Sequence, residues 1–236
     1  MPHTLLAVAL AASLVSAEPA KTRVLIVTGV DTAHNWKATS PVVRDLLQKD
    51  ARIEAQIVDD PEFLASPKLA DYDVVLLHFR NGKPLAHQAE IAKNVSAFVE
   101  KGKGLVVLHF ACGAMGDWPG FADVAGRVWD KKKTHDPRGP YTVRITDVKH
   151  PITQGMKDFQ ADDELYFCLT GDRPMQVLAV AKSKVTKSDQ PMALVCEYGK
   201  GRVFNTPLGH DPKALQMPGV SQLLQRGCLW AAGREP

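Results

Sequence analysis

Three uninterrupted apolar runs constrain the fold of this chain more than any other feature. They occupy residues 23–28, 73–79 and 104–109, and each is rich in Val and Leu with few polar residues inside it. Strands that are buried on both faces show such runs, whereas strands with one solvated face alternate apolar and polar residues. The runs therefore predict strands of a parallel sheet that is covered on both sides.

Helical patterns separate these runs. Ser40 and Pro41 are typical of an N-cap and a first helical position, so a helix is expected to begin there. Residues 52–58 alternate as a further strand, and residues 87–101 carry apolar side chains at helical spacing before Gly102, a typical C-cap residue. Strand, helix and strand in this order predict an α/β sheet with right-handed crossovers.

The second half of the chain is less regular. Strands are expected over 141–146, 177–181, 192–198 and 202–206, and a closing helix over 220–232. The segment Gly199-Lys-Gly201 between two apolar runs is a hairpin signal. Because no linker or repeat divides the chain, we predict one domain with an irregular insertion near 113–140.

Composition excludes several classes of function. The 236 residues are 45% hydrophobic and 23% charged, as in ordinary globular domains, and the net charge of +3 does not favour a nucleic-acid partner. The four cysteines contain no Cys-x-x-Cys pair, which excludes zinc-ribbon and thioredoxin motifs. Pairing of Cys168 with Cys196 or Cys228 is left open.

The N-terminus predicts a Sec-type secretory signal. Residues 5–15 are apolar and uncharged, and Val15-Ser16-Ala17 is a small-residue cleavage pattern, so residues 1–17 are assigned as a signal peptide cut after Ala17. The run is too short for an ordinary membrane span, and no later segment is long and apolar enough. We expect a secreted or periplasmic protein whose mature domain covers residues 21–236.

Polar residues follow the predicted strands, where ligands bind in open α/β sheets. They are His34 and Trp36 after the first strand, His78 and Arg80 after the third, His109 and Cys112 after the fourth, and His210 after the last. His78 lies within an apolar run and is expected to be a packed core residue. The other three histidines, drawn from separate segments, indicate a site.

Two kinds of chemistry suit these histidines. Neutral imidazoles from His34, His109 and His210 can bind Zn²⁺ or a similar divalent metal with a carboxylate completing the set, although no compact zinc motif is present. Alternatively, a histidine acts as general acid or base. The acids Asp163 and Glu164, beside an apolar run, are candidates for proton transfer.

Cys112 offers a third interpretation. It follows a strand in His-Phe-Ala-Cys-Gly, similar to a turn that exposes a nucleophile, but Phe110 stands where such turns have Gly. A buried thiol is the default expectation.

Six segments in order resemble the ThuA-like (trehalose utilisation) family, from Arg23 to Trp230. The matching segments are Val24-Leu-Ile-Val-Thr-Gly29 with His34-Asn-Trp36, Gly104-Leu-Val-Val-Leu-His109, Trp118-Pro-Gly-Phe121, His150-Pro-Ile-Thr-Gln-Gly155, Asp163-Glu-Leu-Tyr166, and Gly199-Lys-Gly-Arg-Val-Phe204 with Leu208-Gly-His210. The resemblance implies a class I glutamine amidotransferase-like fold, a flavodoxin-like three-layer α/β sandwich with a mostly parallel central sheet. Glutaminase activity is not expected, because the Gly-x-Cys-x-Gly turn is not intact and His210-Asp211-Pro212 replaces the His-x-Glu pair.

The resemblance also implies a role in catabolism of trehalose and related keto-glycosides. We expect hydrolysis, elimination or isomerisation of a carbohydrate with Glu164, Asp163 and His109 as catalytic residues, and with Trp36, Arg80 and His135 binding substrate. His34, His109 and His210 are the expected metal ligands, and no nucleotide cofactor is expected. A non-catalytic carbohydrate-binding or accessory protein is the alternative. The oligomeric state is left open, a homo-oligomer included.

Overall fold

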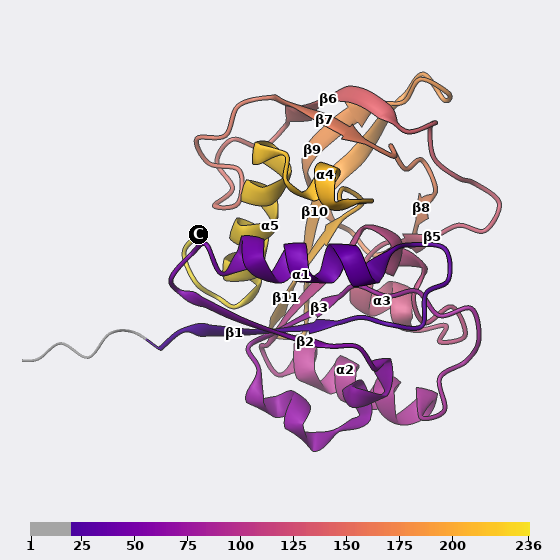
Figure 1. Cartoon of the computed structure of the whole chain (residues 1–236), viewed down its shortest axis with the longest axis vertical. Helices are drawn as coiled ribbons and strands as arrows, with labels where there is room; N and C mark the ends of the chain where they lie inside the picture. The colour runs from indigo at the N-terminus through magenta and orange to yellow at the C-terminus, as the bar shows by residue number, and fades with distance from the viewer. Residues whose placement is uncertain (1–19) are drawn as a thin grey trace, which may run out of the picture.

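A nine-stranded sheet organises the protein, as the computed structural model of residues 20–236 shows (Figure 1). The signal peptide expected over 1–17 lies outside the described residues. The strands are β1 (Thr22–Val27), β2 (Ile53–Val58), β3 (Val74–Leu77), β4 (Gly104–Leu108), β6 (Gly139–Ile145), β7 (Phe159–Asp163), β9 (Gln176–Lys182), β10 (Asp189–Tyr198) and β11 (Gly201–Thr206). The short strands β5 (Val128–Trp129) and β8 (Leu169–Thr170) pair separately.

One half of the sheet is parallel, in the order β2-β1-β3-β4-β11. Every residue of β3 and β4 is buried, as the uninterrupted apolar runs predict. All five strands end at the same edge of the sheet because they run in the same direction. The loops that leave this edge therefore lie side by side.

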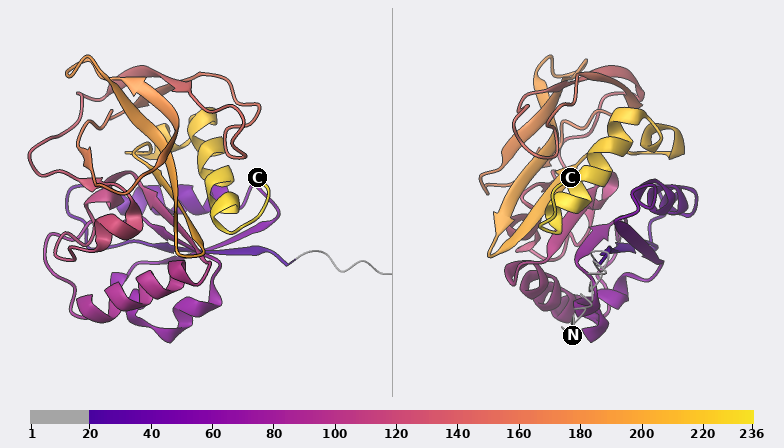
Figure 2. Two further views of the ribbon diagram at one scale, coloured as in Figure 1. Left: turned by 180° about the vertical axis from the view of Figure 1, so that it is seen from behind. Right: turned by 90° about the vertical axis from the view of Figure 1, so that its left-hand side faces the viewer.

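The other half is antiparallel, in the order β11-β10-β9-β6-β7. The hairpin predicted at Gly199–Gly201 joins β10 to β11. Strand β7 has no counterpart among the predicted strands, since its residues Phe159–Asp163 include two acids that break an apolar pattern. Figure 2 shows the orange strands of this half extending away from the indigo N-terminal strands of the parallel half.

Helices cover both faces of the sheet and complete the α/β sandwich that the sequence predicts (Figure 1). Helix α1 (Trp36–Leu47) and helix α5 (Pro218–Ala231) pack on one face, with the short α4 (Pro212–Leu215). Helix α2 (Gln88–Glu100) and the short α3 (Phe121–Ala125) pack on the other, with the 3-10 turns Pro61–Ala65, Pro67–Asp71 and His109–Gly113. No helix of the described chain has the length and apolar character needed to span a membrane.

The expected start of the first helix was wrong. Helix α1 begins at Trp36, because the Asn35 side chain caps it by accepting from the Ala38 backbone N–H at 3.2 Å. The expected cap, Ser40, is buried and its hydroxyl donates to Thr28 instead. Pro41 consequently lies inside the helix.

Candidate metal centre

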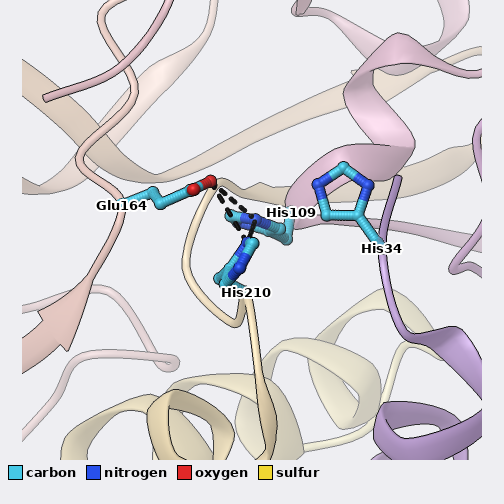
Figure 3. Close-up of side chains that lie close together, drawn as sticks. All are labelled: His34, His109, Glu164 and His210. Carbon is cyan, nitrogen blue, oxygen red and sulfur yellow. Dashed lines mark hydrogen bonds and ion pairs between the residues drawn. The ribbon is translucent and has the colours of Figure 1, made fainter. Parts of the chain in front are cut away.

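Three loops at the carboxyl edge of the parallel half each deliver a histidine to one place. His34 follows β1, His109 follows β4 directly, and His210 follows β11. With Glu164, just beyond β7, they offer four ligand atoms that all lie within 4.8 Å of one another (Figure 3). The sequence placed all four among its candidate site residues, and the structure brings them together.

The His109 ring is fixed in one tautomer. Its Nδ1 lies 2.6 Å from the carbonyl oxygen of Pro207, which can only accept, so Nδ1 carries the hydrogen. Nε2 therefore presents its lone pair toward the cluster, where the Tyr166 hydroxyl donates to it at 2.9 Å. The backbone of His109 has φ 48°, an uncommon left-handed conformation in a sharp turn from strand to 3-10 helix. The turn points a fully buried imidazole at the site.

The loop before α1 orients His34. The Asp31 carboxylate accepts from the backbone N–H groups of Ala33 and His34 and pairs with His34 Nδ1 at 3.0 Å. This leaves Nε2 of His34 facing the cluster, the carboxylate–histidine arrangement found behind metal ligands. The ring also stacks on Phe110, with centroids 4.2 Å apart.

Glu164 is the negative centre of the cluster. Its Oε2 lies 3.2 Å from His210 Nδ1 and 3.7 Å from His109 Nε2. Burial alone would raise the pKa of Glu164, but the side-chain hydrogen bonds and positive charge that the neighbouring imidazoles provide when protonated lower it far below its usual range. The same hydrogen bond to Glu164 raises the pKa of His210, against the opposing effect of burial. A carboxylate with so low a pKa is a weak base, and it is ionised at neutral pH, as a metal ligand must be.

Asp163, the other expected catalytic acid, is enclosed by backbone N–H groups. It is 1% exposed, and it accepts from the backbone N–H groups of Gly209, His210 and Glu164 at 2.6, 3.2 and 2.8 Å. Burial raises its pKa, although His109 and these backbone donors oppose the shift. Asp163 thus ties the end of β7 to the loop that carries His210.

A cavity of about 290 Å³ opens onto the cluster. The predicted substrate residues Arg80 and His135 line it, together with Tyr166 and Trp129. His135 Nδ1 lies 2.8 Å from the carbonyl oxygen of Asp136, so Nδ1 carries a hydrogen, and the other ring nitrogen, Nε2, lies 3.7 Å from Glu164. Trp36, expected to stack on a sugar, lines a separate depression with Lys37 and Asp59.

Two further candidates lie in the core. His78 is fully buried as expected, bonded through Nε2 to Thr39 at 2.8 Å, and burial lowers its pKa to about 3. Cys112 is buried, and burial raises the pKa of its thiol, the opposite of what a nucleophile needs. All four cysteines are free thiols, so the pairing left open for Cys168 is not formed.

Three contributors were absent from the predicted site. Asp31 had no assigned role, and its position three residues before His34 is the one signal that could have linked the two. Tyr166 lay in a recognised motif but had no assigned role. Phe110 was considered only as a departure from a nucleophile turn, because its contact with His34 joins loops that follow two strands distant in sequence.

The sheet and its flanking helices define an α/β sandwich with a glutamine amidotransferase-like fold. Within this class the chain belongs to the ThuA family, described as trehalose utilisation, whose model matches residues 23–231. The strand-to-helix turn of this protein carries His109 at its strained position and keeps Cys112 buried.

Solved structures show the same fold. A ThuA-like protein from Parabacteroides merdae is 23% identical with a TM-score of 0.81, over 91% of each chain. One from Bacteroides uniformis is 18% identical with a TM-score of 0.69, over 91% of this chain and 94% of that one. The glutaminase domain of Trypanosoma brucei CTPS, with bound acivicin, is 10% identical with a TM-score of 0.55, over 92% and 96%. No curated protein matches the chain at a significant level.

Proposed function

We propose that the protein is an exported, divalent-metal-dependent enzyme that transfers a proton next to the carbonyl group of a keto-glycoside. The convergence of His34, His109, His210 and Glu164 carries this proposal. The family's link to trehalose utilisation supports a carbohydrate substrate. The apolar N-terminal run and its cleavage pattern support export.

The donor set fits a metal such as Zn²⁺. Three imidazoles and one carboxylate are ligands that zinc prefers, and two of the imidazoles have their second nitrogen held by Asp31 or by the Pro207 carbonyl. When bound, such an ion would polarise a sugar oxygen and stabilise negative charge that develops on it.

The protein's own groups supply the proton transfer. His135 lines the cavity, and in its neutral form the hydrogen bond from Nδ1 to the Asp136 carbonyl leaves Nε2 free to accept a proton, as a general base requires. Glu164, with its low pKa, serves as a ligand rather than as the base that the sequence suggested. The Tyr166 hydroxyl donates to His109 Nε2 in the absence of metal and becomes free to donate to a sugar oxygen when His109 binds the ion.

The test is the metal content of the purified mature protein. We expect close to one divalent ion per chain, lost in the double variant His34→Ala/His210→Ala and kept in His87→Ala, whose ring is exposed and pairs with Glu62 outside the cluster. His135→Gln should keep the metal but lose deuterium exchange at the carbon beside the carbonyl of a 3-keto-glucoside. A folded wild-type protein that binds no divalent ion would contradict the proposal and favour a carbohydrate-binding protein.

A further inference from the structure

A second cavity, of about 470 Å³, adjoins the cavity of the metal centre. Arg80 and Trp129 line both, so the two spaces share a wall. Trp118, Phe121 and Gly116 are among the other residues around the second space. Volumes of 290 and 470 Å³ together fall within the range of small-molecule sites, roughly 300–1,000 Å³.

The shared wall is linked to the metal centre by direct contacts. The Trp129 ring meets Tyr166 edge to face, with centroids 5.0 Å apart, and Tyr166 in turn donates to His109. Trp118, which also lines the second space, packs on Phe121 with centroids 5.5 Å apart. The lining of the second space thus includes three aromatic side chains, Trp118, Phe121 and Trp129.

Arg80 supplies a polar group at the junction. Among the ion pairs between described residues, none involves Arg80. Its side chain lies against Gly113, where an added Cβ would sit 3.2 Å from the Arg80 Cδ. Because no ion pair between described residues uses the guanidinium, its N–H donors are available to a ligand.

The loop around the second cavity is held in place by its own hydrogen bonds. The Asn81 side chain accepts from the Met115 backbone N–H at 2.7 Å and donates to the Lys83 carbonyl at 2.9 Å. Met115 itself has φ 53° and is fully buried. Because these contacts fix the loop without a ligand, the cavity is formed before anything binds.

We propose that the second cavity is a subsite for the second pyranose ring of a disaccharide-sized glycoside, whose first ring occupies the metal centre. Indole faces bind the apolar C–H face of a sugar ring, and the Arg80 guanidinium donates to ring hydroxyl groups near the linkage. The assignment moves sugar stacking from Trp36 to Trp118 and Trp129. It rests on the proposed function, because the first ring needs a carbohydrate site at the cluster.

The test compares a one-ring and a two-ring probe by calorimetry on the metal-loaded mature protein. We expect trehalose to bind about tenfold tighter than methyl α-glucopyranoside. Trp118→Ala should remove this advantage and leave the binding of methyl α-glucopyranoside unchanged. Trp36→Ala, the matched control in the separate depression, should change neither.

A blocking variant covers the case in which Trp118→Ala fails to fold. A Cβ added at Gly116 meets no atom within 4 Å, so Gly116→Trp can fill the second cavity without a backbone clash. It should also abolish the preference for trehalose. Equal binding of both probes by the wild type, or an unchanged preference in the folded variants, would overturn the subsite and leave the metal centre standing. Binding of neither probe would overturn the subsite, whereas the carbohydrate function is tested separately by deuterium exchange of the 3-keto-glucoside.

Discussion

The parallel and antiparallel halves of the sheet contribute differently to the candidate site. The parallel half supplies three imidazoles from loops that directly follow β1, β4 and β11. The antiparallel half supplies Glu164 just beyond β7, and the two halves touch through the Asp163 bonds to the loop after β11. The three imidazoles of the candidate site thus come from one half, whereas the position of the carboxylate beside them depends on the docking of the other half.

The largest expected effect concerns that docking. Asp163→Asn would turn an amide N–H₂ group toward backbone N–H donors that now reach a carboxylate oxygen. We expect a loss of about 3 kcal/mol in the free energy of unfolding, since buried donors lose their acceptor. Urea denaturation measures the loss, and a metal titration should show weaker binding.

The neighbouring Asp162 is the control. Its carboxylate is solvent-facing and pairs with Lys213 and Arg138. Asp162→Asn should leave the unfolding midpoint nearly unchanged, because exposed ion pairs contribute little. Equal effects of the two substitutions would show that the docking of β7 does not depend on the Asp163 hydrogen bonds.

The next effect concerns the parallel half alone. Asp31→Asn places an amide N–H₂ opposite His34 Nδ1 and favours the tautomer whose Nε2 carries the hydrogen. Zinc affinity should fall about 10- to 100-fold, the usual effect of losing a carboxylate behind a metal-binding histidine. A chelator competition titration measures the zinc affinity, with Asp45→Asn, at an exposed position of α1, as the control. Unchanged affinity in a folded variant would remove His34 from the ligand set.

Sequence reasoning was most successful for the parallel half. Its strands are short, apolar and buried on both faces, so β1, β3 and β4 could be predicted from the runs alone. Strand β7 could not, because its last two residues are acids and the contact that buries Asp163 comes from a loop 46 residues away. Helix α1 was misplaced because Ser40 uses its hydroxyl in a tertiary contact that local pattern does not reveal.

The candidate site also has residues that could be predicted from the sequence and residues that could not. His34, His109 and His210 followed from the rule that ligands bind beyond the carboxyl ends of parallel strands. The different roles of Asp163 and Glu164, which are adjacent in sequence, follow from which one is enclosed by backbone donors. The sequence did not show whether Trp36 or Trp118 is the better candidate for stacking on a sugar ring, because the choice depends on which of their two cavities adjoins the histidine cluster.

The smallest expected effect involves His78, which follows β3 as the other histidines follow their strands. Phe110 contacts both His34 and His78. Its ring is stacked on that of His34, and its ring centroid lies 4.7 Å from the ring centroid of His78. The His78 Nδ1 has no hydrogen-bond partner among residues 20–236, and burial lowers the pKa of the ring from 6.5 to about 3. His78 is therefore neutral where an unfolded chain would bind a proton.

The sign of the pH effect follows from this difference. Between pH 6.5 and about 3 the unfolded state holds one more proton than the folded state, so stability falls as the pH falls. The slope is about 1.4 kcal/mol per pH unit, which gives about 2 kcal/mol between pH 6.5 and pH 5. His78→Gln keeps a polar partner for Thr39 but cannot titrate, so its unfolding free energy should change less between pH 7 and pH 5.

Urea unfolding of the metal-free protein at the two pH values measures the difference, with His87→Gln at an exposed position as the control. Parallel pH profiles for the wild type and His78→Gln would mean that His78 is protonated in the folded protein, or that it is solvated. Either result would add a fourth titrating imidazole beside the cluster and weaken the distinction between the three ligand histidines and the one enclosed in the core.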